Sequence, residues 1–209
     1  MTGFGFDPKR AVAHLRKADP GLAEVIGVVG PFGMQLKVSR SLFGALAEAI
    51  VYQQLSNKAA ATIYGRIEAL YPRAKDGFTP AHIQRTADDR LRGVGLSRAK
   101  VLALRDLAEK VAQRRLPTLD EAHLLDDGTL IERLIEVRGI GRWSAEMFLM
   151  FRLGRPDVLP VDDYSLRKAY ATAFRKRTLP TPEALAKAGE KWRPFRTVAS
   201  WYLWQTLNK

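Results

Sequence analysis

Two adjacent carboxylates, Asp162 and Asp163, are the residues of this chain best placed to do chemistry. They follow a loop containing glycine and proline, Gly154 to Pro160, and precede a stretch in which apolar residues recur at helical spacing. One carboxylate can cap the new helix, and the other can then face a substrate. The N–H groups and the dipole at a helix N-terminus favour an ionised carboxylate. The pair predicts a fixed negative charge, while either residue taken alone is explained equally well as a cap.

A glycine turn lies upstream of the carboxylates. Helical spacing predicts a helix that begins with a capping box formed by Thr129 and Glu132 and ends at the turn Gly139 to Gly141. The helical period resumes directly afterwards, so the segment is interpreted as a helix, a tight hairpin and a second helix. Backbone N–H groups at the start of that second helix can approach a phosphate, and Arg138 and Arg142 flank them.

The order of these features resembles the helix-hairpin-helix DNA glycosylase superfamily, in which a Gly-x-Gly hairpin precedes an invariant aspartate. The likeness is strongest to the AlkA-type alkylpurine glycosylases, because GIGRW at residues 139–143 and PVDDY at residues 160–164 are similar to the GIGRW and PDDY of that branch. The resemblance implies a two-lobed all-α fold with the active site between the lobes. One lobe would span about 42–160, with the hairpin at 130–153, and the other about 1–41 plus 161–209.

The resemblance also implies the reaction, which is hydrolysis of the bond between a damaged base and deoxyribose. The sugar then becomes oxocarbenium-like, so the site needs an anion beside it and access for water. Through the following Tyr164-x-Leu166, Asp163 matches the catalytic aspartate of the family, and Asp162 would be the helix cap that orients it.

The base pocket is expected to be aromatic. By resemblance Trp204 stacks on the extruded base, and Trp143 and Met147 line the pocket, whereas Trp192 and Trp201 are expected to pack in the core. Bifunctional members of the superfamily carry a lysine where this chain has Trp143. The resemblance therefore implies a monofunctional hydrolase of the DNA-3-methyladenine glycosylase II type, acting on cationic bases such as 3-methyladenine and 7-methylguanine, which suit aromatic faces.

A polar group at a predicted helix end is a second candidate DNA contact. Two consecutive glutamines at such a place are commonly solvated surface, but the AlkA-type family has a matching loop that fills the gap left by the extruded base. By resemblance Gln54 or Leu55 is the inserted residue, with Gln53 and Ser56 beside it. A second Arg-Gly-apolar-Gly sequence, beginning at Arg92, predicts either another hairpin or a simple glycine turn, and the family pattern adds Lys100 to the DNA contacts.

No cofactor is expected to be required. Zero cysteines exclude thiolate zinc and a Cys-ligated iron–sulfur cluster. By resemblance, the backbone carbonyls of Ile135, Val137 and Gly139 could hold a Na⁺ or K⁺ ion that bridges to a DNA phosphate.

The charge of the chain indicates a polyanionic partner. Lys and Arg number 34 against 22 Asp and Glu, a net charge of +12, which favours nucleic acid over a membrane surface, although a merely basic surface is the simpler explanation. We expect double-stranded DNA, a monomer, no membrane span, and a cytoplasmic, nucleoid-associated location. The excess is concentrated after Ser165, where the cations are Arg167, Lys168, Arg175, Lys176, Arg177, Lys187, Lys191, Arg193, Arg196 and Lys209.

Helical periodicity and the lack of any alternating β-branched run predict about ten helices and no sheet. Further helices are expected after Asp7-Pro8, Thr79-Pro80 and Thr181-Pro182, where a capping residue precedes proline. Two other functions fit the same pattern. One is a glycosylase for mismatched or oxidised bases, and the other is a non-catalytic DNA-binding module.

Overall fold

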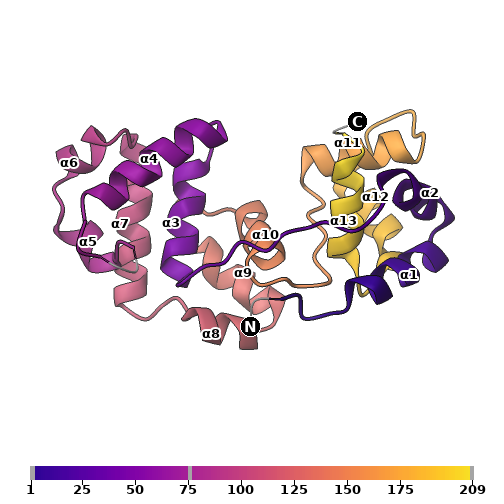
Figure 1. The fold of residues 1–209 in the computed structure, drawn as a ribbon, viewed down its shortest axis with the longest axis horizontal. Helices are drawn as coiled ribbons and strands as arrows, with labels where there is room; N and C mark the ends of the chain where they lie inside the picture. The colour runs from indigo at the N-terminus through magenta and orange to yellow at the C-terminus, as the bar shows by residue number, and fades with distance from the viewer. Residues whose placement is uncertain (1–2, 75–76, 208–209) are drawn as a thin grey trace. The chain divides into compact units, whose positions relative to one another are not determined.

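The computed structural model describes residues 3–74 and 77–207 of the chain. Within those ranges it contains thirteen α-helices, one 3₁₀ helix and no strand, which confirms the all-α prediction (Figure 1). The structure has more helices than the ten or so expected, because a helix as short as the six residues of α6 contains too few turns to show a period. In the same ranges no helix is long and apolar enough to cross a membrane.

The chain divides into two compact units, Met1–Lys37 with Leu149–Lys209, and Val38–Phe148. The chain passes from one to the other at 37/38 and 148/149, whereas the expected boundaries lie near 41/42 and 160/161. The hairpin turn belongs to the second of these units, and both aspartates belong to the first.

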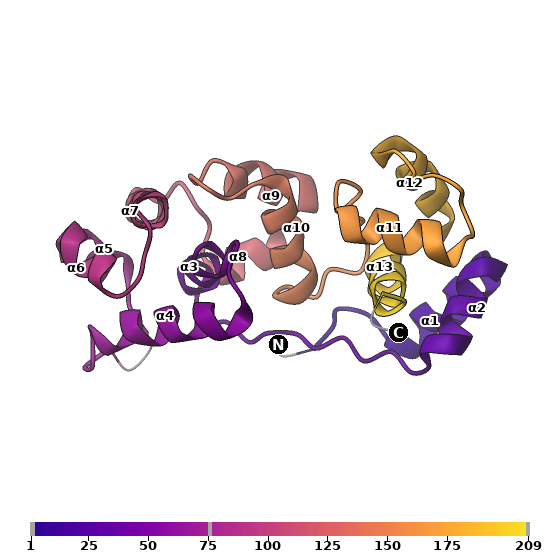
Figure 2. The same ribbon diagram turned by 90° about the horizontal axis from the view of Figure 1, so that it is seen from above.

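In the unit Val38–Phe148, the long helix α7 lies against α3, α5 and α6, and α4 packs on α3. Figure 2 shows α3 and α7 nearly end-on, with α4 running lengthwise. Each helix start is explained by a local cap, such as Ser41 for α3 and Ser97 for α7. The helices are α3 (Leu42–Tyr52), α4 (Asn57–Ala69), α5 (Pro80–Arg85), α6 (Asp88–Gly93), α7 (Arg98–Ala112), α8 (Leu119–Leu124), α9 (Asp127–Ile135) and the first part of α10 (Arg142–Phe151).

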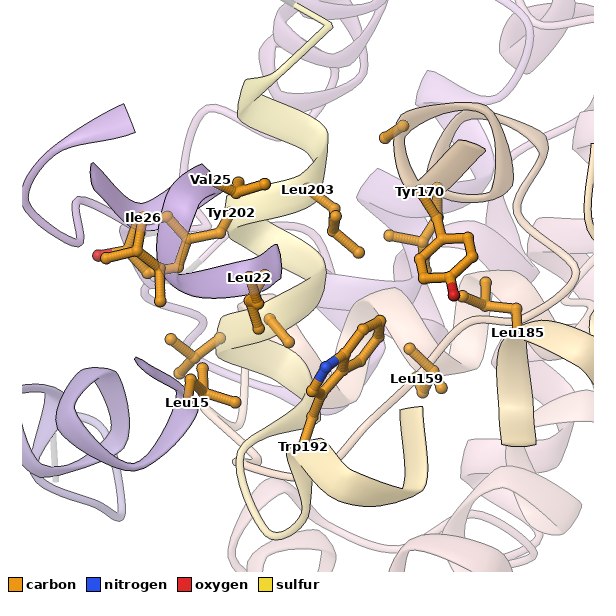
Figure 3. Packing of buried hydrophobic residues seen from close by; sticks show 14 of the residues in the cluster. Leu15, Leu22, Val25, Ile26, Leu159, Tyr170, Leu185, Trp192, Tyr202 and Leu203 are labelled. Atoms are coloured by element: carbon orange, nitrogen blue, oxygen red, sulfur yellow. The ribbon is translucent and has the colours of Figure 1, made fainter. Parts of the chain in front are cut away.

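The unit formed by Met1–Lys37 and Leu149–Lys209 is built around α13, which contacts α1, α2 and α11. Its buried core gathers side chains from all of these helices (Figure 3). Trp192 is fully buried there and donates its indole N–H to Asp19 Oδ2 at 2.7 Å. The helices are α1 (Pro8–Ala18), α2 (Pro20–Val29), α11 (Tyr164–Ala173), α12 (Pro182–Gly189), the 3₁₀ helix η1 (Glu190–Trp192) and α13 (Arg196–Gln205).

The expected capping box at Thr129 and Glu132 is wrong. Helix α9 begins three residues earlier than predicted, at Asp127, and its N-cap is Asp126, whose Oδ1 accepts the Thr129 N–H at 2.9 Å. Aspartate is at least as good an N-cap as threonine, so the upstream residue starts the helix. By contrast, α5 begins at the expected Thr79-Pro80, where Thr79 and His82 form a capping box, and α8 begins with a capping box formed by Thr118 and Glu121.

The Arg-Gly-apolar-Gly sequence at Arg92 joins two helices, α6 and α7. Gly95 adopts φ +107° in the connection, a conformation that L side chains rarely adopt, and Ser97 caps the helix that follows. The segment is therefore a helix, a glycine turn and a helix, like the segment around Gly139.

Candidate active site and nucleic-acid interface

Asp163 forms the N-terminus of α11. Its Oδ1 accepts the backbone N–H of Leu166 at 2.5 Å, so Asp163 is the N-cap. The prediction that Asp162 caps the helix is wrong, because the helix begins one residue later than that prediction requires, and Asp162 is exposed. The residue matched to the catalytic aspartate of the family therefore also caps the helix that follows it.

Trp204, on α13, holds the same carboxylate from the side. Its indole Nε1–H donates to Asp163 Oδ1 at 3.2 Å, and its ring stacks on Phe151 with centroids 6.2 Å apart. Hydrogen bonds to a charged acceptor are stronger than those between neutral groups, so the two donors fix the orientation of the carboxylate. The sequence did not indicate this contact, which gives Trp204 a positioning role in addition to the stacking role inferred by resemblance.

The loop before the aspartates is fixed by the start of α13. Thr197 is fully buried, donates its hydroxyl to the Arg155 carbonyl at 2.6 Å and accepts the Val158 N–H at 3.0 Å. The Arg196 guanidinium binds the Asp157 carboxylate through Nε at 2.7 Å and through NH2 at 3.0 Å. None of these contacts was predicted, because they join positions about forty residues apart.

Several of the C-terminal cations that were expected to face DNA are engaged within the protein. Arg193 and Arg196 pair with Asp157 and Glu190, and Lys191 pairs with Asp19. Lys209 lies outside the described residues. Five further exposed cations lie on α11, α12 and the loop between them: Lys168, Arg175, Lys176, Arg177 and Lys187.

The hairpin in the other unit has the geometry that its glycines predict. Gly139 adopts φ +81°, Ile140 is buried, and Gly141 lies directly before α10. A Cβ added at Gly141 would meet no heavy atom within 4 Å. The backbone at the start of α10 is therefore open to close approach by an anion.

Helix α7 holds the backbone directly before the hairpin turn. The Asp106 carboxylate accepts the backbone N–H of Arg138 at 2.7 Å and the Lys110 ammonium at 2.5 Å. Burial alone raises the pKa of Asp106, but the hydrogen bonds from Lys110 and Arg138 outweigh it, so the pKa lies below its ordinary value of 3.8. The backbone of Arg138 is thereby fixed, while its side chain is exposed.

Gln53 and Lys100 make contacts inside the protein. Gln53 donates its side-chain amide to the Gly139 carbonyl at 2.7 Å, and the Lys100 ammonium donates to the carbonyls of Val51 and Gln53 at 2.7 and 2.9 Å. Burial lowers the pKa of Lys100. These two hydrogen bonds use two of the three N–H donors of the ammonium and cap the C-terminal end of α3. A DNA contact by this lysine stays a prediction.

The loop after α3 presents the two residues predicted to enter DNA. Gln54 is exposed with φ +57°, and Leu55 is 39% exposed. Ser56 caps α4 by accepting the Ala59 N–H at 3.3 Å. We call Gln54 and Leu55 the wedge loop.

One face of α10 carries the expected pocket residues of this unit. Trp143, 47% exposed, and the half-buried Met147 are four residues apart and so lie on the same side of the helix. Arg142 pairs with Glu146 at 3.2 Å, and the Glu146 side chain is only 6% exposed. The sequence did not single out Glu146, although a carboxylate four residues after an arginine was a signal for such a pair.

Two of the three carbonyl oxygens predicted to hold a cation already accept hydrogen bonds. Gly139 O accepts Gln53, and Val137 O accepts the Ile140 N–H at 2.9 Å. Each carbonyl oxygen has a second lone pair. These oxygens and that of Ile135 are therefore suitable ligands for a hard cation such as Na⁺ or K⁺. In the ranges described, no cluster of three or more His, Asp or Glu side chains offers a different metal site.

Comparison with known proteins accords with this arrangement of hairpin and aspartate. The model of the HhH-GPD superfamily of base excision DNA repair proteins matches residues 47–194. The chain belongs to this superfamily. It is 35% identical over 198 residues to DNA-3-methyladenine glycosylase 1 of Schizosaccharomyces pombe, covering 94% of this chain and 86% of that protein.

Two solved structures resemble this HhH-GPD protein over nearly its whole length. The 3-methyladenine DNA glycosylase Mag1 of S. pombe, in complex with abasic DNA, has a TM-score of 0.83 at 35% identity, covering 96% of this chain and 97% of that one. A DNA-3-methyladenine glycosidase from Bacillus halodurans has a TM-score of 0.84 at 36% identity, covering 94% and 88%. The family and the two-lobed glycosylase fold inferred from the motifs are confirmed.

Proposed function

We propose that this protein is a monofunctional DNA glycosylase that releases alkylated purines, such as 3-methyladenine and 7-methylguanine, from double-stranded DNA. The observation that carries the proposal is Asp163, whose carboxylate receives N–H donors from Leu166 and Trp204. An HhH-GPD chain that served only to bind DNA would have no need to orient this carboxylate with a tryptophan.

The reaction follows from the charge that develops on the sugar. As the bond from C1′ to the base nitrogen breaks, its electron pair leaves with the base, and positive charge spreads over C1′ and the ring oxygen. Asp163 stabilises that charge electrostatically, because its bonds to Leu166 and Trp204 hold the carboxylate in one orientation. Water then adds its oxygen to C1′ and loses a proton, which leaves an abasic site.

The absence of a lyase step is supported by Trp143. Strand cutting in the superfamily needs an amine that attacks C1′ to form a Schiff base. Trp143 occupies the position after the hairpin where bifunctional members have that lysine, and an indole nitrogen is not a nucleophile of this kind.

Selection of alkylated purines is supported by the aromatic side chains. A base that carries a positive charge is a good leaving group and interacts favourably with electron-rich rings, by about 0.5 to 2 kcal/mol. The Trp204 ring is held between its hydrogen bond to Asp163 and its stacking on Phe151, so it can offer one defined face.

DNA binding is assigned to the hairpin and the wedge loop. Phosphate approaches the open backbone at Gly141 with Arg138 nearby, and Gln54 or Leu55 fills the space of the extruded base. A Na⁺ or K⁺ on the carbonyls of Ile135, Val137 and Gly139 would strengthen the phosphate contact. Because its partner is DNA, we place the protein at the nucleoid, acting as a monomer.

The test is release of free base from methylated duplex DNA, with strand integrity measured before and after alkali. The wild type should release 3-methyladenine and 7-methylguanine and leave strands intact until alkali is added. Asp163→Asn should lose release, and the matched control Asp162→Asn, at an exposed position outside the cap, should keep it. If the wild type bound duplex DNA without releasing any base, the non-catalytic alternative would replace our proposal.

A further inference from the structure

Gln53 is held at both ends, and each contact ties it to a different part of the unit Val38–Phe148. Its backbone carbonyl accepts the Lys100 ammonium of α7 at 2.9 Å. Its side-chain amide donates to the Gly139 carbonyl of the hairpin at 2.7 Å and reaches Ser144 Oγ at 3.5 Å. The contact with Gly139 spans 86 residues of sequence, so local chain geometry does not explain it.

The wedge loop begins at the next residue. Gln54 adopts φ +57°, a left-handed conformation that is unfavourable for a residue with a side chain and persists only where its surroundings impose it. Helix α3 ends at Tyr52 and α4 begins at Asn57, so the connection between them is short, and Gln53 is the residue that directly precedes the wedge loop. The two fixed ends of Gln53 therefore set the direction in which Gln54 and Leu55 leave the protein.

We propose that Gln53 is a positioning residue that locks the wedge loop to the phosphate-binding hairpin, so that binding of the backbone and opening of the base stack occur in a fixed register. The inference rests on the proposed function. A side chain that pushes into a base stack meets resistance, since unstacking is unfavourable. A loop attached only through its own chain would yield to that resistance, whereas the amide to Gly139 transmits it to the hairpin that holds the DNA.

Gln53→Met tests the lock, because methionine nearly matches glutamine in length and volume but has no N–H. Single-turnover excision would be measured on two duplexes, one with the lesion opposite its normal partner and one with the lesion opposite an abasic position, where extrusion is easier. The variant should be at least about tenfold slower than wild type on the first duplex and within about twofold on the second. Only in the first duplex must the inserted residue help to break a base pair before the base can be extruded.

A matched control is Gln113→Met, the same substitution at the far end of α7, where the amide donates to Glu109 Oε1, one turn away, at 2.9 Å. It should behave as wild type on both duplexes. Thermal unfolding of both variants shows whether either change affects the fold. A second measurement needs no excision: in an Asp163→Asn background, the fluorescence of 2-aminopurine placed beside the lesion reports unstacking, and adding Gln53→Met should reduce it while duplex affinity changes little.

Equal slowing on both duplexes would assign Gln53 to the chemistry or the fold and overturn the inference, as would unchanged excision and fluorescence. Failure of the proposed function looks different, since the wild type would then excise from neither duplex. In that case the fluorescence experiment still decides whether Gln53 governs stack opening.

Discussion

Helices α10 and α11 differ in the residue that precedes their first turn. The first N–H groups of any helix lack partners within the helix and attract negative charge. At α11 the chain supplies the charge itself through Asp163. At α10 the preceding residue is Gly141, which has no side chain, and the space where a Cβ would lie is empty.

On the function that we propose, the start of a helix serves two different purposes in this protein. Where a reaction needs a permanent anion, an aspartate closes the helix and is oriented by it. Where a ligand brings the anion, a glycine leaves the helix open and the neighbouring residues, here Asp106 and Gln53, hold the turn in place. Substitutions at Asp163 and Gly141, the residues that precede the two helices, test this contrast.

The largest effect is expected at Asp163. Asp163→Asn and Asp163→Ala should each reduce the single-turnover excision rate by at least about 10² to 10³, because the stabilising charge is gone. Only Asp163→Ala should lower the free energy of unfolding, by about 1 kcal/mol, since asparagine caps as well as aspartate. Excision kinetics and urea unfolding together separate the two roles, and equal stability losses would show that the cap is not what holds α11.

An aspartate placed directly before α10, as Asp163 stands before α11, should weaken DNA binding. Gly141→Asp places a carboxylate where phosphate would bind, so duplex affinity should fall at least about tenfold, or about 1.4 kcal/mol. The stability of the free protein should change by only a few tenths of a kcal/mol, because glycine and aspartate are similar N-caps. Fluorescence anisotropy at fixed salt measures the affinity. Gly141→Ala is the neutral control and should cost less affinity than the aspartate; the reverse order would contradict the electrostatic explanation.

A smaller effect is expected when the indole N–H is removed from Asp163. Trp204→Phe keeps an aromatic ring against Phe151 but no donor, so the excision rate should fall about tenfold, equivalent to about 1.4 kcal/mol of lost positioning. Trp201→Phe is the matched control, because that ring packs against Phe32 and Tyr202 in the core. If both variants excise at the wild-type rate, the contact at 3.2 Å does not orient the carboxylate.

The smallest effect concerns the support of the hairpin and its dependence on pH. The folded pKa of Asp106 lies below 3.8, so its contribution is complete above that pH and is lost as pH falls through the folded pKa. Asp106→Asn should therefore be less stable than wild type by about 1 kcal/mol at pH 7, and the difference should vanish on acidification below the folded pKa. Thermal unfolding between pH 2 and pH 7 measures it, and a difference that grew towards acid would reverse the predicted sign.

The sequence predicted most helix starts, the hairpin and the order of its parts, because caps, prolines and glycines act over three or four residues. It misplaced the caps of α9 and α11, where a second capping residue stood within a few positions and only packing decides between them. It could not predict the contacts that position the candidate site. Gln53 to Gly139, Trp204 to Asp163 and Thr197 to Val158 each join residues at least 39 positions apart, so no spacing rule contains them.

The double role that we propose for Asp163, as helix cap and as catalytic carboxylate, has a genetic consequence. Aspartate and asparagine codons differ by one base, and asparagine keeps the cap that aspartate provides. A single transition could therefore produce a protein that accumulates normally and still occupies damaged DNA but removes nothing. Protein abundance would not reveal such an allele, and a strain that carried it would be recognised only by its sensitivity to methylating agents.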